Sequence, residues 1–164
     1  MRALIGTCLL AASLLAGGAT AATAQANPTP LGPDGYGPVK IGMSLKKAKA
    51  TGVIVPDEST KDYCTYWHFK KFGKPKGDSW HVIISKKRGV VVIQAQKGMK
   101  TPEGITFGST FKRLQAAYPR LEKDFHGFYV TDVPGNKKAL YRFAVTKGKV
   151  TQFYIEHKKQ DCIN

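Results

Sequence analysis

The sequence VKIGMSLKKAKA at residues 39–50 has a similar counterpart, ITFGSTFKRLQA, at residues 105–116. Each copy has a short apolar–polar–apolar run, a Gly suited to a turn, a Ser or Thr that can cap a helix, and apolar side chains three residues apart on a short helix. Leu45 and Ala48 in the first copy correspond to Phe111 and Leu114 in the second. This internal similarity predicts two tandem units in one chain.

Three strand-like runs follow each predicted helix. They cover residues 63–72, 79–85 and 90–96 in the first unit, and residues 125–133, 140–146 and 150–157 in the second. The segment that joins the units, residues 101–104, is too short for an interdomain linker. The sequence therefore predicts an α+β fold: two tandem repeats of short strand, helix and three-stranded antiparallel meander forming one sheet-and-helix domain. Repeat one would span residues 34–100, and repeat two residues 101–164.

The two Gly-centred motifs resemble a known family. The motif GMS at residues 42–44 before a short helix, duplicated as FGST at residues 107–110, is similar to the secreted β-lactamase inhibitory proteins of actinobacteria. A related single-copy motif occurs in the small lipoprotein of the outer-membrane barrel-assembly machinery. The resemblance implies a helix layer on a curved antiparallel sheet whose concave side grips a partner protein. That family keeps a disulfide within each repeat, and none of its inhibitory residues is matched here.

The N-terminus has the organisation of a signal peptide, predicted at residues 1–26. Arg2 supplies the positive charge, an apolar run follows, and small residues suit cleavage after Ala24 or Ala26. Residues 27–164 would then be a single domain, without a later run long enough to span a membrane. Cys64 and Cys162 remain after cleavage, and an oxidising compartment favours a disulfide between them. The sequence thus predicts a secreted, extracellular protein, either free or associated with the cell wall.

The composition is strongly basic. The chain has 26 Lys and Arg residues against 11 Asp and Glu residues, a formal net charge of +15, and the excess is spread along its length. The electrostatic field of this positive charge attracts anionic partners such as cell-wall polymers, lipid head groups, nucleic acid or an acidic protein. The competing interpretation is that the charge only keeps the protein soluble. The sequence has no specific nucleic-acid motif.

The densest aromatic and basic stretch is YCTYWHFKKF at residues 63–72. Alternate residues of a strand point to opposite faces, so we expect Trp67 and Phe69 to be buried and their neighbours to face outward. Tyr and Trp are common anchors of protein interfaces. The competing interpretation is a purely structural cross-strand aromatic cluster. The candidate binding residues are Tyr66, His68, Lys70, Lys71 and Trp80.

Enzyme chemistry has little support. The four histidines are isolated, no catalytic or phosphate-binding motif is present, and Cys64 and His68 lack the second ligand cluster that a metal site needs. We expect no cofactor. Glu156 and His157, beside two lysines, are the local candidate for a small secreted ribonuclease, but on a strand they point to opposite faces. We expect a secreted non-enzymatic binding module. Inhibition of an extracellular or envelope protein is one form that this binding would take. The alternative is a cationic protein adhering to anionic cell-wall polymer or nucleic acid.

Overall fold

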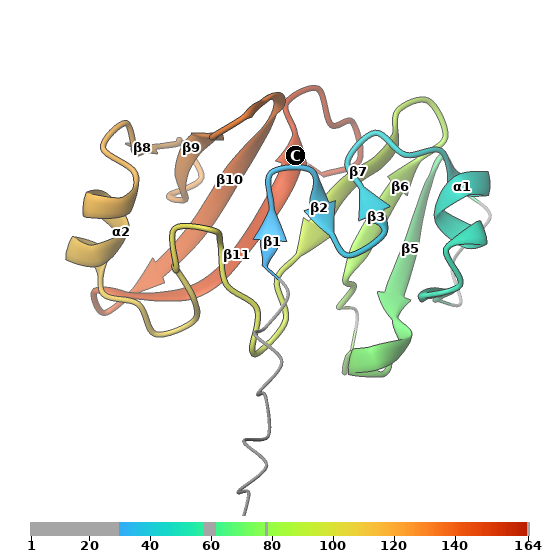
Figure 1. Ribbon diagram of the computed structural model, residues 1–164, viewed down its shortest axis with the longest axis horizontal. Helices are drawn as coiled ribbons and strands as arrows, with labels where there is room; N and C mark the ends of the chain where they lie inside the picture. The colour runs from blue at the N-terminus through green and yellow to red at the C-terminus, as the bar shows by residue number, and fades with distance from the viewer. Residues whose placement is uncertain (1–29, 58–61, 78, 164) are drawn as a thin grey trace, which may run out of the picture.

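The computed structural model describes residues 30–57, 62–77 and 79–163 (Figure 1). The predicted signal peptide, residues 1–26, lies outside the described residues. In the described part of the chain, no helix is long and apolar enough to cross a membrane. This part forms a three-stranded sheet, an eight-stranded sheet and two short α-helices.

The three-stranded sheet consists of β1 (Leu31–Gly32), β2 (Gly35–Tyr36) and β3 (Val39–Lys40), paired antiparallel in that order. It lies in front of the middle of the eight-stranded sheet (Figure 1). The Leu31 backbone joins it to the rest of the molecule: its carbonyl accepts a hydrogen bond from the Tyr141 hydroxyl at 2.8 Å, and its N–H donates to the Lys100 carbonyl at 2.9 Å.

The eight-stranded antiparallel sheet has the order β4-β5-β6-β7-β11-β10-β9-β8. Each half is a meander, and the halves meet where β7 pairs with β11, with Ile93 opposite Ile155 and Val92 opposite Glu156. Each of the six predicted strand runs overlaps one of these strands. The bounds are β4 (Ile54–Pro56), β5 (Cys64–Phe69), β6 (Val82–Ser85), β7 (Gly89–Gln94), β8 (Glu122–Lys123), β9 (Tyr129–Val133), β10 (Asn136–Thr146) and β11 (Lys149–His157).

Both α-helices begin at a side-chain cap, as the sequence predicts. The Lys47 N–H donates to Ser44 Oγ at 3.4 Å at the start of α1 (Leu45–Ala50), and the Arg113 N–H donates to Thr110 Oγ1 at 3.2 Å at the start of α2 (Phe111–Ala117). Each cap satisfies a backbone N–H that the first helical turn leaves unpaired.

The predicted fold class, α+β with two strand–helix–meander repeats, is wrong, because the protein is mostly β. The α-helices have six and seven residues and lie at opposite ends of the sheet, so they form no layer (Figure 1). Four strands follow each helix, since β4 and β8 were not expected. Residues 39–40 form β3, whereas residues 105–109 form no strand, because Ile105 exchanges hydrogen bonds with Thr101 instead. The similar segments therefore share a turn and a helix cap rather than a complete repeat.

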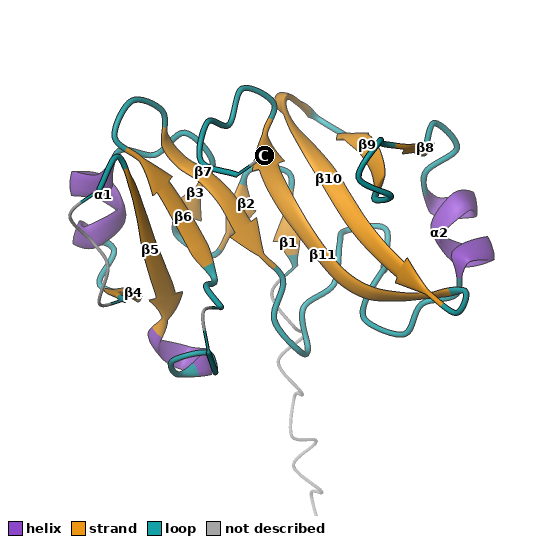
Figure 2. Ribbon diagram, turned by 180° about the vertical axis from the view of Figure 1, so that it is seen from behind, coloured by secondary structure: helices purple, strands orange, loops and turns teal. Residues whose placement is uncertain are grey.

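The two faces of the eight-stranded sheet differ in how they are covered. The main core lies on the face toward β1–β3 and the helices, where Trp67 and Phe69 are buried as expected. We call the other side, seen in Figure 2, the open face. A smaller cluster lies on this side, with Ile83, Val92 and Tyr154 at its centre.

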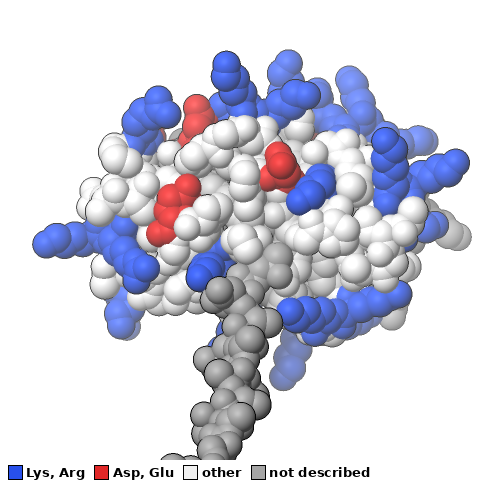
Figure 3. Space-filling model, in the orientation of Figure 1, with Lys and Arg blue, Asp and Glu red and all other residues white. Residues whose placement is uncertain are grey.

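The Lys and Arg side chains are not concentrated on one strand or helix. On the side that carries the three-stranded sheet, they project mainly from the periphery, around a centre with few charges (Figure 3). The charge distribution thus favours a broad positive field over a single basic groove.

Candidate functional site

The open face carries three aromatic side chains, Trp80, Tyr154 and Phe128, in which the Tyr154 ring contacts both of the others. We call them the aromatic row. The ring centroids of Trp80 and Tyr154 are 6.3 Å apart, and those of Tyr154 and Phe128 are 6.1 Å apart. The row belongs to the cluster built on the fully buried Ile83 and Val92, which face the same side because the register places them opposite each other. Sheet packing therefore holds these rings in place.

A partly buried charge cluster lies beside the aromatic row. The Arg142 guanidinium donates to Glu156 Oε1 from Nε at 3.1 Å and from Nη2 at 2.9 Å, and it also forms an ion pair with Asp124. It lies 5.4 Å from the centroid of the Phe128 ring, within the range of a cation–π contact. Burial by itself would lower the pKa of Arg142, but the two carboxylates outweigh that effect and raise the pKa. The guanidinium is therefore charged and fixed in orientation.

Asp124 also organises the turn at residues 124–128. Its Oδ1 accepts hydrogen bonds from the His126 N–H at 3.0 Å and the Phe128 N–H at 2.9 Å, and its backbone N–H donates to the Phe128 carbonyl at 2.8 Å. Gly127 has a φ of 89°, which L-residues rarely adopt. The resulting turn leaves Phe125 93% exposed, so the molecule presents a large apolar ring to solvent on a hydrogen-bonded support.

A cavity of about 650 Å³ lies between this turn and the C-terminal segment. Cavities of this size suit a small ligand or several side chains of a partner. Its polar lining is formed by His126, Arg142 and Gln160, and the rest is largely aromatic or aliphatic. The main lining residues are Phe125, Phe128, Arg142, Tyr154, Gln160 and Ile163.

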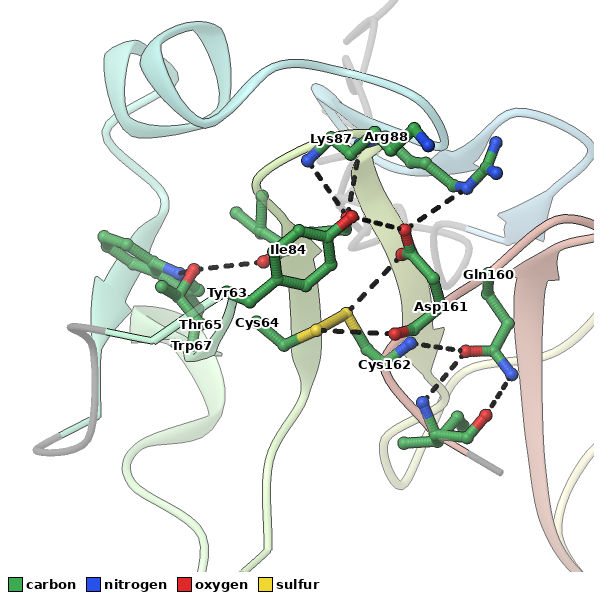
Figure 4. Close-up of a disulfide and its surroundings, with 12 residues drawn as sticks. Tyr63, Cys64, Thr65, Trp67, Ile84, Lys87, Arg88, Gln160, Asp161 and Cys162 are labelled. Carbon is green, nitrogen blue, oxygen red and sulfur yellow. Dashed lines mark hydrogen bonds and ion pairs between the residues drawn. A yellow bond between two sulfur atoms is a disulfide. The ribbon is translucent and has the colours of Figure 1, made fainter.

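The C-terminal segment, residues 158–163, is fastened to β5 by the predicted disulfide between Cys64 and Cys162 (Figure 4). The carboxylate of Asp161 pairs with Arg88 Nε at 3.3 Å and accepts from the Tyr63 hydroxyl at 2.9 Å. Burial would raise the pKa of Asp161, but hydrogen bonds and Arg88 outweigh it and lower the pKa. The segment therefore stays ionically paired near neutral pH.

The Gln160 side chain completes the attachment of the C-terminal segment. Its Oε1 accepts from the backbone N–H groups of Cys162 at 3.0 Å and Ile163 at 2.9 Å. Cys162 and Ile163 then pack on the cluster of the open face. One wall of the 650 Å³ cavity is thus formed by a segment that the disulfide fixes.

The structure separates the candidate binding residues into two groups. Tyr66 and Trp80 pack on the open face, and His68 is half-buried, with Nδ1 2.7 Å from Asp57 Oδ1. Lys70 and Lys71 do not continue the strand, because β5 ends at Phe69 and the 3-10 helix η1 (Lys70–Phe72) begins there. These two lysines line a separate, smaller cavity.

Sequence reasoning missed most of the open-face site. The sequence predicts one strand over residues 125–133, but β9 begins only at Tyr129. The signal that could have located the turn is Asp124 followed three residues later by Gly127. Nothing local indicates that Arg142 and Glu156 lie side by side, since this depends on the β10–β11 register.

The side chains of Glu156 and His157, the residues considered for a ribonuclease, bond to different partners. Glu156 is 2% exposed and bonds to Arg142, and its Oε2 has no hydrogen-bond partner among the described residues. His157 accepts a hydrogen bond from the Lys159 N–H at Nδ1, at 3.0 Å. Burial lowers the pKa of His157, and Arg88 and nearby lysines lower it further.

Comparisons with known proteins leave the function open. No protein-family model matches the sequence, and no curated protein matches it. The crystal structure of the uncharacterized protein yfeY from Escherichia coli is similar, with a TM-score of 0.50 and 14% sequence identity, over 79% of this chain and 100% of that chain. At this identity, the similarity concerns the fold alone. The resemblance to the β-lactamase inhibitory proteins stays a prediction.

Proposed function

We propose that this chain is a secreted, non-enzymatic binding module that holds an extracellular or envelope protein against the open face. The observation that carries the proposal is Phe125, a 93% exposed aromatic ring beside a cavity lined by Phe128, Tyr154 and Arg142. Aromatic and Arg side chains are enriched at the energetic centres of protein interfaces, because they bury much area at low entropic cost.

The rigidity of this surface supports a preformed interface. Asp124 fixes the turn that carries Phe125, and Arg142 is held by two carboxylates. A surface that is already ordered loses little conformational entropy on association. The expected partner is acidic, because the net charge of +15 favours negatively charged surfaces and accelerates encounter with them.

The secreted location rests on the predicted signal peptide at residues 1–26 together with the Cys64–Cys162 disulfide. Structural disulfides are characteristic of oxidising compartments. The same location would suit an inhibitor, if the partner is an enzyme whose active site the open face covers.

A site-specific photocrosslinker tests the proposal. The full chain is prepared with p-benzoylphenylalanine at position 125, and separately at position 46 on α1 as a matched exposed control, and each is irradiated with culture-supernatant and envelope proteins. We expect position 125 to give a discrete crosslinked acidic protein that persists when salt is raised a few-fold. Trp80→Ala, which removes one ring of the aromatic row, should reduce the yield about tenfold or more.

A second candidate is adhesion by charge to an anionic polymer, which the peripheral Lys and Arg side chains favour (Figure 3). Adhesion predicts equal crosslinking from positions 46 and 125, no effect of Trp80→Ala, and release at a few-fold higher salt. That set of results would replace the open-face proposal.

A further inference from the structure

A second cavity, of about 270 Å³, lies on the side of the molecule opposite the open face. It is formed where β2, the turn between α1 and β4, and η1 come together. Tyr36, Val53 and Phe69 form its apolar part, and Lys70 and Lys71 complete the lining. We call it the Tyr36 cavity. Its residues come from segments well separated in the sequence, which local patterns do not connect.

The apolar part of the Tyr36 cavity is preformed. Tyr36 is 9% exposed and Phe69 is 2% exposed, and their rings pack edge to face with centroids 5.1 Å apart. Behind them, the His81 ring stacks on Phe69 and accepts a hydrogen bond from the Phe69 N–H at Nδ1, at 3.1 Å. Burial lowers the pKa of His81 to about 4, so this support is uncharged at neutral pH. The cavity therefore keeps an apolar wall without rearrangement.

The mouth of the Tyr36 cavity is cationic. Lys70 and Lys71 are exposed, and neither forms an ion pair within the described residues. The Lys70 backbone is fixed by its N–H, which donates to the Val53 carbonyl at 2.9 Å. Among the residues that the structure describes, no carboxylate lines the cavity. Lys71 Nζ lies 5.8 Å from the centroid of the Phe72 ring. An apolar recess edged by two ammonium groups that form no ion pair among the described residues is complementary to a ligand with an apolar body and an anionic head.

We propose that the Tyr36 cavity binds a small carboxylate amphiphile, with its alkyl or aromatic body against Tyr36 and Phe69 and its carboxylate between Lys70 and Lys71. The volume is slightly below the usual range for drug-sized ligands, which limits the occupant to a single ring or a short alkyl chain. This site is separate from the open face, so it does not depend on the function proposed above.

A homologous series of fatty acids tests the site. Hexanoate, heptanoate and octanoate are titrated into the ¹⁵N-labelled protein, and amide shifts of Gly52, Val53 and Gly73 report occupancy. We expect each added methylene to tighten binding about fourfold, which is the effect of burying one CH₂. Shifts without any chain-length dependence would mean that the apolar cavity is not used, and would overturn the proposal.

Matched lysine variants test the charged mouth. Lys70→Gln/Lys71→Gln should weaken octanoate binding several-fold and leave 1-octanol binding unchanged. The control is Lys46→Gln/Lys47→Gln, which changes an exposed doublet on α1 that does not line the cavity. It should change neither octanoate binding nor 1-octanol binding. Equal weakening by both doublets would show nonspecific attraction to a basic protein and would contradict the site.

A plugging variant and a vesicle arm complete the experiment. Val53→Trp should abolish binding of octanoate and octanol together; if this variant fails to fold, the exposed lysine variants decide the matter. The carboxylate can also be presented by a membrane, so neutral phosphatidylcholine vesicles with added decanoate are sedimented with the protein. Co-sedimentation lost in Lys70→Gln/Lys71→Gln but kept in the control doublet would identify a lipid source, whereas shifts with free octanoate alone would identify a soluble one.

Discussion

His81 shows how one buried side chain couples stability to pH. It is 3% exposed, and burial, followed by the nearby His68, lowers its pKa from 6.5 to about 4 in the folded state. Between these values the unfolded chain binds more protons than the folded chain, so stability falls as the pH falls through this window. We expect a loss of roughly 2–3 kcal/mol between pH 7 and pH 4 from this group.

The measurement is urea unfolding at several pH values, for the wild type and for His81→Gln. Glutamine keeps an acceptor for the Phe69 N–H but cannot gain a proton, so the variant should lose less stability on acidification. The exposed His126→Gln is the control and should follow the wild type. Parallel pH profiles for the wild type and His81→Gln would show that His81 does not couple to folding.

At the scale of elements, a close backbone contact joins the turn before α1 to β7. The Gly42 N–H donates to the Val90 carbonyl, and the Val90 N–H donates to the Met43 carbonyl, both at 2.8 Å. A Cβ on Gly89 would lie 2.4 Å from the Met43 carbonyl oxygen, and its φ is +73°. Gly42 has a similar φ of +79°, but a Cβ there meets nothing within 4 Å. A comparison of alanine substitutions at Gly42 and Gly89 therefore separates the cost of backbone strain from the cost of a steric clash.

Gly42→Ala should cost about 1–2 kcal/mol, from the left-handed conformation alone. Gly89→Ala should cost roughly 3–4 kcal/mol, because the turn must also shift away from β7 and weaken its hydrogen bonds. The free energy of unfolding in urea gives both values. Equal costs would mean that the turn and β7 separate freely.

For the whole molecule, the disulfide has the largest expected effect. Cys64 and Cys162 are 98 residues apart, so their link closes a long loop in the unfolded chain, and this is worth about 4–5 kcal/mol in the chain-entropy model. Cys64→Ser/Cys162→Ser should lower the free energy of unfolding by this amount, and the wild type in reductant should behave alike. Hydrogen exchange at residues 160–163 should also accelerate. A double variant within about 1 kcal/mol of the wild type would contradict this.

Several features were predictable from the sequence because they depend on neighbouring residues. The caps at Ser44 and Thr110 and the burial of Trp67 and Phe69 follow from local spacing. The disulfide was predictable for a different reason, since only two cysteines follow the predicted signal peptide. The fold class was not, because the strands β4 and β8 are too short to show a period and the segment at 105–109 satisfies its backbone within a turn.

The sequence by itself determined the positive charge, the helix caps, the alternation along β5 and the pairing of the cysteines, since each depends on composition or on adjacent residues. Only the tertiary structure decided which face of the sheet stays open, where Phe125 projects, and that Tyr66 and Lys70 belong to different surfaces. The physical reason is that strand order and register bring together residues far apart in the chain. No local periodicity encodes these long-range pairings.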